Sequence, residues 1–157
     1  MSAKNVNLKI INRQYYETLE PKGEAFAREL SLEDEIEIMT EAKLYQKPNA
    51  TFITYEEPED TGFDNSKTVI KLEDEVLSIK RFGGDSDGHM DLTLQEGAMS
   101  ITTYVIPMAR IEIEVYTNDV KGELTDEGYG KIFADYSVRI ADLTKTRNKL
   151  EIDITKA

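Results

Sequence analysis

The sequence predicts an all-β fold: one closed antiparallel up-and-down barrel of about eight to ten strands, formed by residues 1–157. Apolar and polar residues alternate with a period of two along most of the chain, as expected of strands with one buried face. Short connections rich in Gly, Asn, Asp and Pro separate these segments. Because parallel strands need crossovers of about a dozen residues or more, such short connections favour hairpins. A barrel is favoured over a sandwich, since closure removes the exposed edges of a long meander.

The predicted strands follow one another along the whole chain. Even positions are apolar in the first segment, Val6–Ile10, and mostly so in the second, Glu35–Leu44. Arg110–Tyr116 alternates strictly. The remaining segments are Ala50–Glu57, Ser66–Leu72, Val76–Phe82, Met90–Leu94, Met99–Ile106, Lys131–Ile140 and Leu150–Ile154. Turn-forming residues separate them at 47–49, 62–65, 73–75, 83–88 and 96–97.

One short helix is expected in the first connection, over Pro21–Leu30. Pro21 suits a first helical turn, and Ala25, Phe26 and Leu30 could place an apolar stripe against a barrel end. Residues 15–34 are therefore interpreted as a helical or loop insertion in a single barrel domain.

The composition excludes several classes of function. The chain has no cysteine, which removes thiolate catalysis, cysteine-ligated zinc, iron–sulfur clusters and disulfides. The net charge is −12, so nucleic acid and anionic membranes are poor partners, because binding to them relies on Lys and Arg. No apolar run resembles a signal peptide or approaches the length of a membrane span, so a cytoplasmic location is expected.

Acidic residues concentrate in one part of the chain. Residues 31–60 hold nine acids and two bases, which gives this segment a net charge of −7. One interpretation is a docking face for a basic protein partner. The other is a solvated sheet surface that keeps the protein soluble.

No motif for catalysis, metal binding or a cofactor is recognised. His89, the only histidine, lies in a Gly-rich turn that cannot easily align a Ser-His-Asp triad. The stretch from Asp85 to Glu96 imitates a calcium loop, but Met90 occupies its sharp-turn position and strands flank it. Adjacent carboxylates on a strand point to opposite faces, and the glycines form no phosphate-binding fingerprint. No catalytic residue, metal ligand or cofactor is therefore assigned.

The candidate ligand-binding residues are polar residues at positions where alternation predicts burial. Four polar residues each continue a strand face whose other members are apolar. They are Thr40 after Ile36 and Ile38, Arg81 after Leu77 and Ile79, Thr103 after Met99 and Ile101, and Tyr136 between Ala134 and Val138. A buried arginine needs acceptors and a buried tyrosine hydroxyl needs a partner, which suggests an anionic or polar ligand inside the barrel. The alternative is that Arg81 lies at the barrel mouth and pairs with an acid, Glu41 or Glu57.

Several segments resemble a known family: Thr40-Glu41-Ala42, Tyr55-Glu56-Glu57 followed by Thr61-Gly62, Arg81-Phe82-Gly83, and Tyr104-Val105-Ile106-Pro107. From about Glu35 to the C-terminus, the sequence resembles the YwiB-like family of small bacterial proteins of unknown function. The resemblance implies a barrel similar to the calycin or lipocalin type and a bacterial cytosolic setting, with no assigned activity. Tyr55 and Tyr104, which stand in these segments, complete the candidate ligand-binding residues.

The leading functional prediction is a non-catalytic barrel that binds a small molecule in its lumen or mouth, because a barrel of this size can hold one small ligand. An adaptor that docks a basic protein on the acidic face is the alternative. An enzyme with carboxylates at the barrel mouth is a third hypothesis. The sequence names neither a ligand nor an oligomeric state.

Overall fold

The computed structural model describes residues 3–23, 25–56, 66–83, 90–106, 109–140 and 144–157. At residues 17–22, 25–31, 83, 90, 103–106, 109 and 144 it describes the backbone alone. The strands are β1 (Lys4–Lys22), β2 (Ala25–Lys47), β3 (Ala50–Glu56), β4 (Ser66–Glu73), β5 (Val76–Gly83), β6 (Met90–Leu94), β7 (Met99–Ile106), β8 (Ala109–Leu124), β9 (Gly130–Ile140) and β10 (Thr144–Lys156). No helix occurs among the described residues. The prediction of an all-β chain of about ten strands is confirmed.

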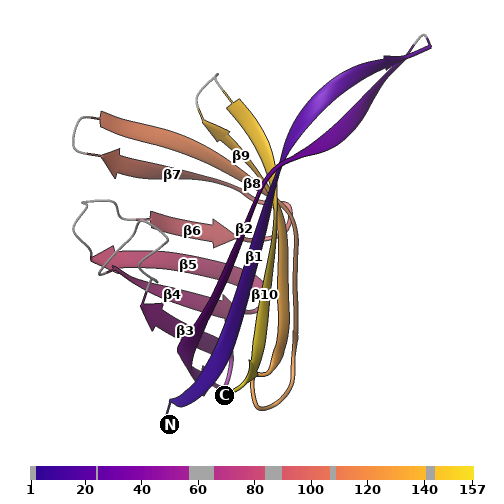
Figure 1. Ribbon diagram of the computed structural model, residues 1–157. Helices are drawn as coiled ribbons and strands as arrows, with labels where there is room; N and C mark the ends of the chain where they lie inside the picture. Colours follow the sequence, from indigo (N-terminus) through magenta and orange to yellow (C-terminus); the bar gives the residue numbers. More distant parts are fainter. Residues whose placement is uncertain (1–2, 24, 57–65, 84–89, 107–108, 141–143) are drawn as a thin grey trace.

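All ten strands belong to one antiparallel sheet that follows the order of the chain (Figure 1). The sheet order is β6-β5-β4-β3-β2-β1-β10-β9-β8-β7, so strands that are consecutive in sequence pair with each other everywhere except between β6 and β7. The first and last strands pair with each other, from Val6 opposite Lys156 to Tyr16 opposite Thr146. This pairing curls the meander toward a barrel.

The barrel is nearly closed, which corrects the prediction of full closure. β6 and β7 stand at the two ends of the sheet, and no backbone ladder joins their described residues. Two side chains of β7 bridge them instead: the Thr102 hydroxyl donates to the Asp91 carbonyl oxygen at 2.8 Å, and the Ser100 hydroxyl donates to that of Thr93 at 3.5 Å. We call this junction of β6 and β7 the seam.

The predicted helix over Pro21–Leu30 is wrong, and so is the interpretation of residues 15–34 as a helical or loop insertion. This segment is the outer part of a β1–β2 hairpin that projects from the barrel at the upper right of Figure 1. Lys22 pairs with Ala25, and Gly23 in the tight turn between them has a φ of +63°. Glycine adopts this left-handed conformation without steric cost, whereas inside a helix it would be unfavourable. Beyond Tyr16, β1 no longer pairs with β10, so this outer part has two strands only.

The core lies on the concave face of the sheet, where apolar side chains from every second position meet. β1 contributes Val6, Leu8 and Ile10 to it. The other buried members of this core cluster are Ala42, Leu44, Ile53, Tyr55, Ile70, Leu77, Leu94, Val115, Val120, Ile132, Ala134, Tyr136, Leu150, Ile152 and Ile154. Their alternation along the strands is the period of two that the sequence shows.

Side chains meet across the interior at one end of the barrel. A Cβ atom added to Gly122 of β8 would lie 2.6 Å from Cδ2 of Leu72 on β4, so two strands that are not neighbours in the sheet approach each other there. The turn between β8 and β9 contacts the same end, because Gly128 lies directly against the Leu44 side chain. Lys4 lies over the Tyr129 ring with its Nζ 4.3 Å from the ring centroid. Side chains therefore occupy part of the interior at this end.

Candidate functional site

The concave face changes from apolar to polar along β1 and β10 at nearly the same level. On β1, the core residues are followed at every second position by Asn12, Gln14 and Tyr16. On β10, the order Ile154, Ile152, Leu150 continues to Asn148 and Thr146. Asn12 pairs with Leu150 and Gln14 pairs with Asn148, so the change on β1 comes one inward-facing position before the change on β10. We call this polar end of the concave face the barrel mouth.

A row of polar residues crosses four strands at the mouth. Gln14 pairs with Asn148, Asn148 with Tyr136, and Tyr136 with Thr117. Residues directly opposite one another in an antiparallel sheet share a face, so all four side chains point into the barrel. Asn148, Tyr136 and Thr117 are buried. Burial raises the pKa of the Tyr136 hydroxyl to about 12, because the charged form loses its hydration.

A second polar row contains two of the sequence-predicted residues. Tyr55 of β3 pairs with Thr68 of β4, and Thr68 pairs with Arg81 of β5. Tyr55 and Thr68 are buried and Arg81 is half-buried. The structure therefore places Tyr55 and Arg81 on one face with a hydroxyl between them, on the concave side of the sheet.

The other sequence-predicted residues stand apart from these rows. Thr40 is half-buried opposite Leu8, and its hydroxyl donates to the Glu41 carbonyl oxygen at 3.2 Å. The side chains of Thr103 and Tyr104 lie outside the described residues. The expectation that Met99 and Ile101 face the core is wrong, because each is 64% exposed. On β7 it is the half-buried Ser100 and Thr102 that face β6, where their hydroxyls close the seam.

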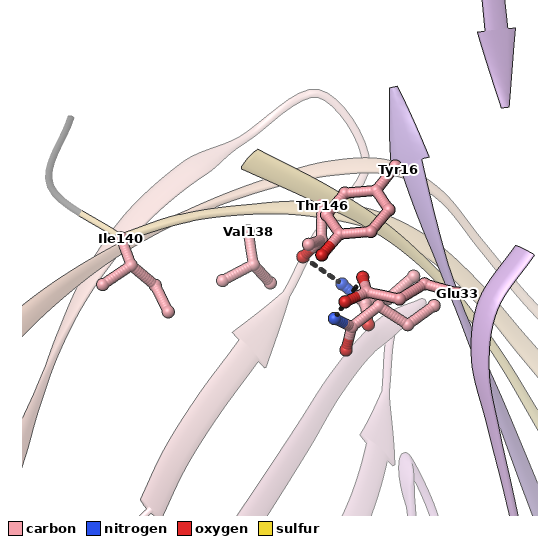
Figure 2. A pocket seen from close by; sticks show the side chains of 7 residues that line it. Tyr16, Glu33, Val138, Ile140 and Thr146 are labelled. Carbon is pink, nitrogen blue, oxygen red and sulfur yellow. Dashed lines mark hydrogen bonds between the residues drawn. The ribbon is translucent and has the colours of Figure 1, made fainter. Parts of the chain in front are cut away.

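A pocket opens at the mouth next to the first polar row (Figure 2). Its volume is about 200 Å³. Four strands contribute to it: β1, β2, β9 and β10. Figure 2 shows Tyr16, Thr146 and Glu33 gathered on one side, with Val138 and Ile140 side by side on the other. The lining residues are Gln14, Tyr16, Glu33, Val138, Ile140, Thr146 and Asn148.

A β-bulge places Glu33 in this pocket. Gln14 pairs with Asp34, but the next residue, Tyr15, pairs with Leu32, so Glu33 has no partner opposite it on β1. Bulges of this kind re-aim a side chain. The Glu33 carboxylate accepts a hydrogen bond from Gln14 Nε2 at 3.1 Å. It also accepts one from the Tyr16 hydroxyl, and this bond and the carboxylate charge raise the pKa of that tyrosine.

The remaining polar groups of the pocket bond to each other. Asn148 Nδ2 donates to the Thr146 hydroxyl oxygen at 3.4 Å. One level further into the barrel, Asn12 Oδ1 is buried and accepts no hydrogen bond from the described residues. The pocket thus combines a carboxylate, two amides and two hydroxyls with an apolar wall.

Sequence reasoning missed all seven residues that line this pocket. Among the candidate residues, Tyr136 comes near it, because Tyr136 pairs with the pocket residue Asn148. The signal was available on β1 and β10, where Gln14 and Asn148 continue the alternating faces of the flanking core positions. It was overlooked because the first predicted strand ended at Ile10 and the last began at Leu150, so neither reached these residues. Glu33 gave no such signal, since its position depends on the bulge.

Two comparisons with known proteins give the same assignment. A family model described as "Domain of unknown function (DUF1934)" matches residues 26–152. The chain belongs to this family. The crystal structure of the ywiB protein from Bacillus subtilis matches with a TM-score of 0.69 and 20% sequence identity, and covers 99% of this chain and 95% of that one. This confirms the resemblance to a YwiB-like family and, at this identity, shows a shared barrel fold. No curated protein matches.

The DUF1934 match begins at residue 26, so the β1 residues of the pocket lie outside it. Pocket residues on β2, β9 and β10 lie within it. The structural match covers almost the whole chain, β1 included. The mouth is therefore built partly from the segment that the DUF1934 model describes and partly from the first strand.

An ion pair on the outer surface supports the strands behind the pocket in this DUF1934 chain. Arg147 binds Asp135 through two hydrogen bonds, Nε to Oδ1 at 2.9 Å and Nη2 to Oδ2 at 2.7 Å. Asn118, the extra residue of a bulge in β8, donates to the same carboxylate at 3.3 Å. Burial alone would raise the pKa of Asp135, but the bonds from Arg147 and Asn118 outweigh it and lower that pKa. Arg147 lies between the pocket residues Thr146 and Asn148 in sequence, so the pair fixes β10 where it lines the mouth.

The acidic segment forms an exposed surface that its neighbours partly neutralise. Glu35 lies 3.4 Å from Arg13, and Glu37 lies 3.5 Å from Lys9. Residues 57–60, which carry three of the nine acids, lie outside the described residues. In the part that is described, two of the charges expected to attract a basic partner are already paired within the chain.

Among the described residues, no group of three or more His, Cys, Asp or Glu side chains could hold a metal ion. Residues 85–89, which include His89 and begin the calcium-like stretch, lie outside these residues. A search of the described residues finds no helix long and apolar enough to cross a membrane.

Proposed function

We propose that this protein is a non-catalytic barrel that binds a small molecule at its mouth. The observation that carries the proposal is the pocket of about 200 Å³ at the polar end of the concave face. Ligand sites are concave, combining an apolar wall with a few converging polar groups. A cavity of roughly 150 Å³ holds a molecule the size of benzene, so this pocket suits a ligand of about six to eight heavy atoms.

The chemistry of the pocket supports binding more than catalysis. Glu33 is the single carboxylate among the lining residues, and no histidine or lysine accompanies it. Acid–base catalysis by carboxylates commonly uses two groups in different protonation states. Here the polar groups bond to one another and hold a fixed arrangement, which suits recognition.

Native mass spectrometry tests this proposal. The purified protein is compared with two variants on neighbouring residues of β9: Ile140→Trp, which fills the pocket, and Arg139→Trp, a control on an exposed residue of the opposite face. We expect a small retained mass in the unaltered chain and the control, lost on denaturation and absent from the pocket variant. An adduct that survives in Ile140→Trp would contradict binding at this site. If the unaltered chain retains no mass and binds nothing in a fragment screen, the proposal is wrong.

Two further expectations accompany this proposal, and an alternative stands beside it. The cytoplasmic location rests on the sequence, and the relation to calycin or lipocalin barrels rests on the resemblance. The adaptor role of the acidic segment receives less support, since Arg13 and Lys9 already pair with Glu35 and Glu37. Charge reversal at Glu35, Glu37 and Glu41, followed by a pull-down, tests that role.

A further inference from the structure

Several hydrogen-bond donors of the pocket are used within the pocket itself. Gln14 Nε2 and the Tyr16 hydroxyl both donate to Glu33, and Asn148 Nδ2 donates to Thr146. The Glu33 carboxylate has lone pairs for further hydrogen bonds, because each of its two oxygens can accept more than one. The side-chain carbonyls of Gln14 and Asn148 are acceptors as well. A ligand that supplies donors is therefore complementary to these oxygens.

A buried acceptor below the pocket points the same way. Asn12 Oδ1 is buried without a donor among the described residues, and Asn12 stands two residues before Gln14 on the same face of β1. Two residues along a strand correspond to about 7 Å. A buried acceptor without a partner costs free energy. A donor that enters the pocket, directly or through a water molecule, would remove this cost.

The charge of the site selects a cation among possible donors. Glu33 carries the only formal charge among the described residues that line the pocket. Asp34, the exposed neighbour that pairs with Gln14, adds a second negative charge at the rim. The whole chain carries −12, so the surrounding potential attracts cations and repels anions.

The opposite wall limits the rest of the ligand. Val138 and Ile140 lie side by side across from the polar cluster and offer apolar surface without hydrogen-bonding groups (Figure 2). A pocket of about 200 Å³ leaves room for a short aliphatic chain beside them. Resting on the proposed function, we infer that the ligand is a small aliphatic amine, whose protonated primary amino group binds Glu33 and whose carbon chain packs on Val138 and Ile140.

Three four-carbon probes of different charge test this inference on the unaltered protein: butylammonium, 1-butanol and butyrate. Binding is followed by chemical-shift changes in two-dimensional NMR spectra. We expect butylammonium to bind about tenfold or more tightly than 1-butanol, because a charge-assisted hydrogen bond is stronger than a neutral one. Butyrate should bind more weakly still. Equal binding of butylammonium and 1-butanol, tighter binding of butyrate, or no saturable shift with butylammonium at millimolar concentration would overturn the inference.

Variants locate the effect and separate it from the proposed function. Glu33→Gln should abolish the preference for butylammonium, while Glu35→Gln, a matched change at the acid that pairs with Arg13, should retain it. A preference unchanged in Glu33→Gln would contradict the role of this carboxylate. If Ile140→Trp removes a retained adduct but the unaltered chain prefers butyrate or 1-butanol, the mouth binds a ligand and the amine assignment alone fails. Because the three-probe comparison uses the unaltered chain, it holds even if a variant does not fold.

Discussion

At the level of single residues, Tyr136 is the buried titratable group beside the pocket. Burial raises the pKa of its hydroxyl from 10.0 to about 12. Between these pH values the unfolded chain loses this proton while the folded chain keeps it, so the free energy of unfolding falls as the pH rises. Over this pH range, we expect the free energy of unfolding of the unaltered protein to fall by about 2–3 kcal/mol more than that of Tyr136→Phe. Urea unfolding at each pH measures this difference.

A control separates this effect from general alkaline unfolding. Tyr116→Phe removes an exposed hydroxyl and should leave the pH dependence of the unaltered protein unchanged. If Tyr136→Phe and Tyr116→Phe follow the same curve, the Tyr136 hydroxyl is not held neutral by burial.

Asp135 has the opposite dependence on pH. Its pKa is lowered below 3.8, so its contribution to stability is present above the pKa of the unfolded carboxyl and is lost as the pH falls through the folded value. Asp135→Asn leaves Arg147 without its carboxylate. At neutral pH we expect the free energy of unfolding to fall by about 1–3 kcal/mol, measured by denaturant titration.

The difference in free energy of unfolding between the unaltered protein and Asp135→Asn should shrink below pH 4, because the carboxyl then becomes protonated in the folded and the unfolded state. Asp126→Asn, at an exposed turn position, should change the free energy of unfolding little at any pH. A constant difference between the unaltered protein and Asp135→Asn at all pH values would contradict a charge-based contribution.

At the level of elements, the β4–β5 turn is strained. Asp74 and Glu75 both have positive φ angles, 50° and 63°, and they join Glu73 directly to Val76. Such two-residue turns prefer Asp-Gly, because glycine tolerates this conformation. Glu75→Gly should raise the free energy of unfolding by about 0.5–1 kcal/mol, measured by denaturant unfolding.

The turn between β8 and β9 provides the control. Glu127 is exposed and is not among the described residues with positive φ. Glu127→Gly should therefore be neutral or destabilising, since glycine there adds only freedom to the unfolded chain. Equal effects of Glu75→Gly and Glu127→Gly would show that backbone strain at Glu75 is absent.

Some elements were predictable from the sequence and others were not. The bounds of β6 and β7 agree with the predicted Met90–Leu94 and Met99–Ile106, because turn residues flank short alternating runs. The outer hairpin was mistaken for a helix, because the spacing of Phe26 and Leu30 fits a helix face as well as a strand face. The local pattern fits a helix and a strand equally well. The turn at Gly23, with its positive φ, makes this segment a hairpin.

At the level of the whole molecule, the meander was predictable and the site was largely not. Alternation identified Tyr136 as buried, because its strand has one apolar face. It assigned the wrong face of β7 to the core, since Ser100 and Thr102 face inward to bond β6 and leave Met99 and Ile101 exposed. Glu33 enters the pocket through a register shift between two strands, and such a shift depends on pairing that no single segment of sequence encodes.

The pairing of β1 with β10 also bears on how fast the chain can fold. It is the one ladder that joins strands far apart in sequence, and such non-local pairings slow folding. A circular permutant that links the paired termini and begins at β7 would make every ladder join consecutive strands. We expect this permutant to refold faster than the natural order in stopped-flow experiments, with only the hydroxyl bridges of the seam left as distant contacts. β1 and β10 meet in the middle of the sheet, and this placement of the first and last strands raises the contact order of the fold.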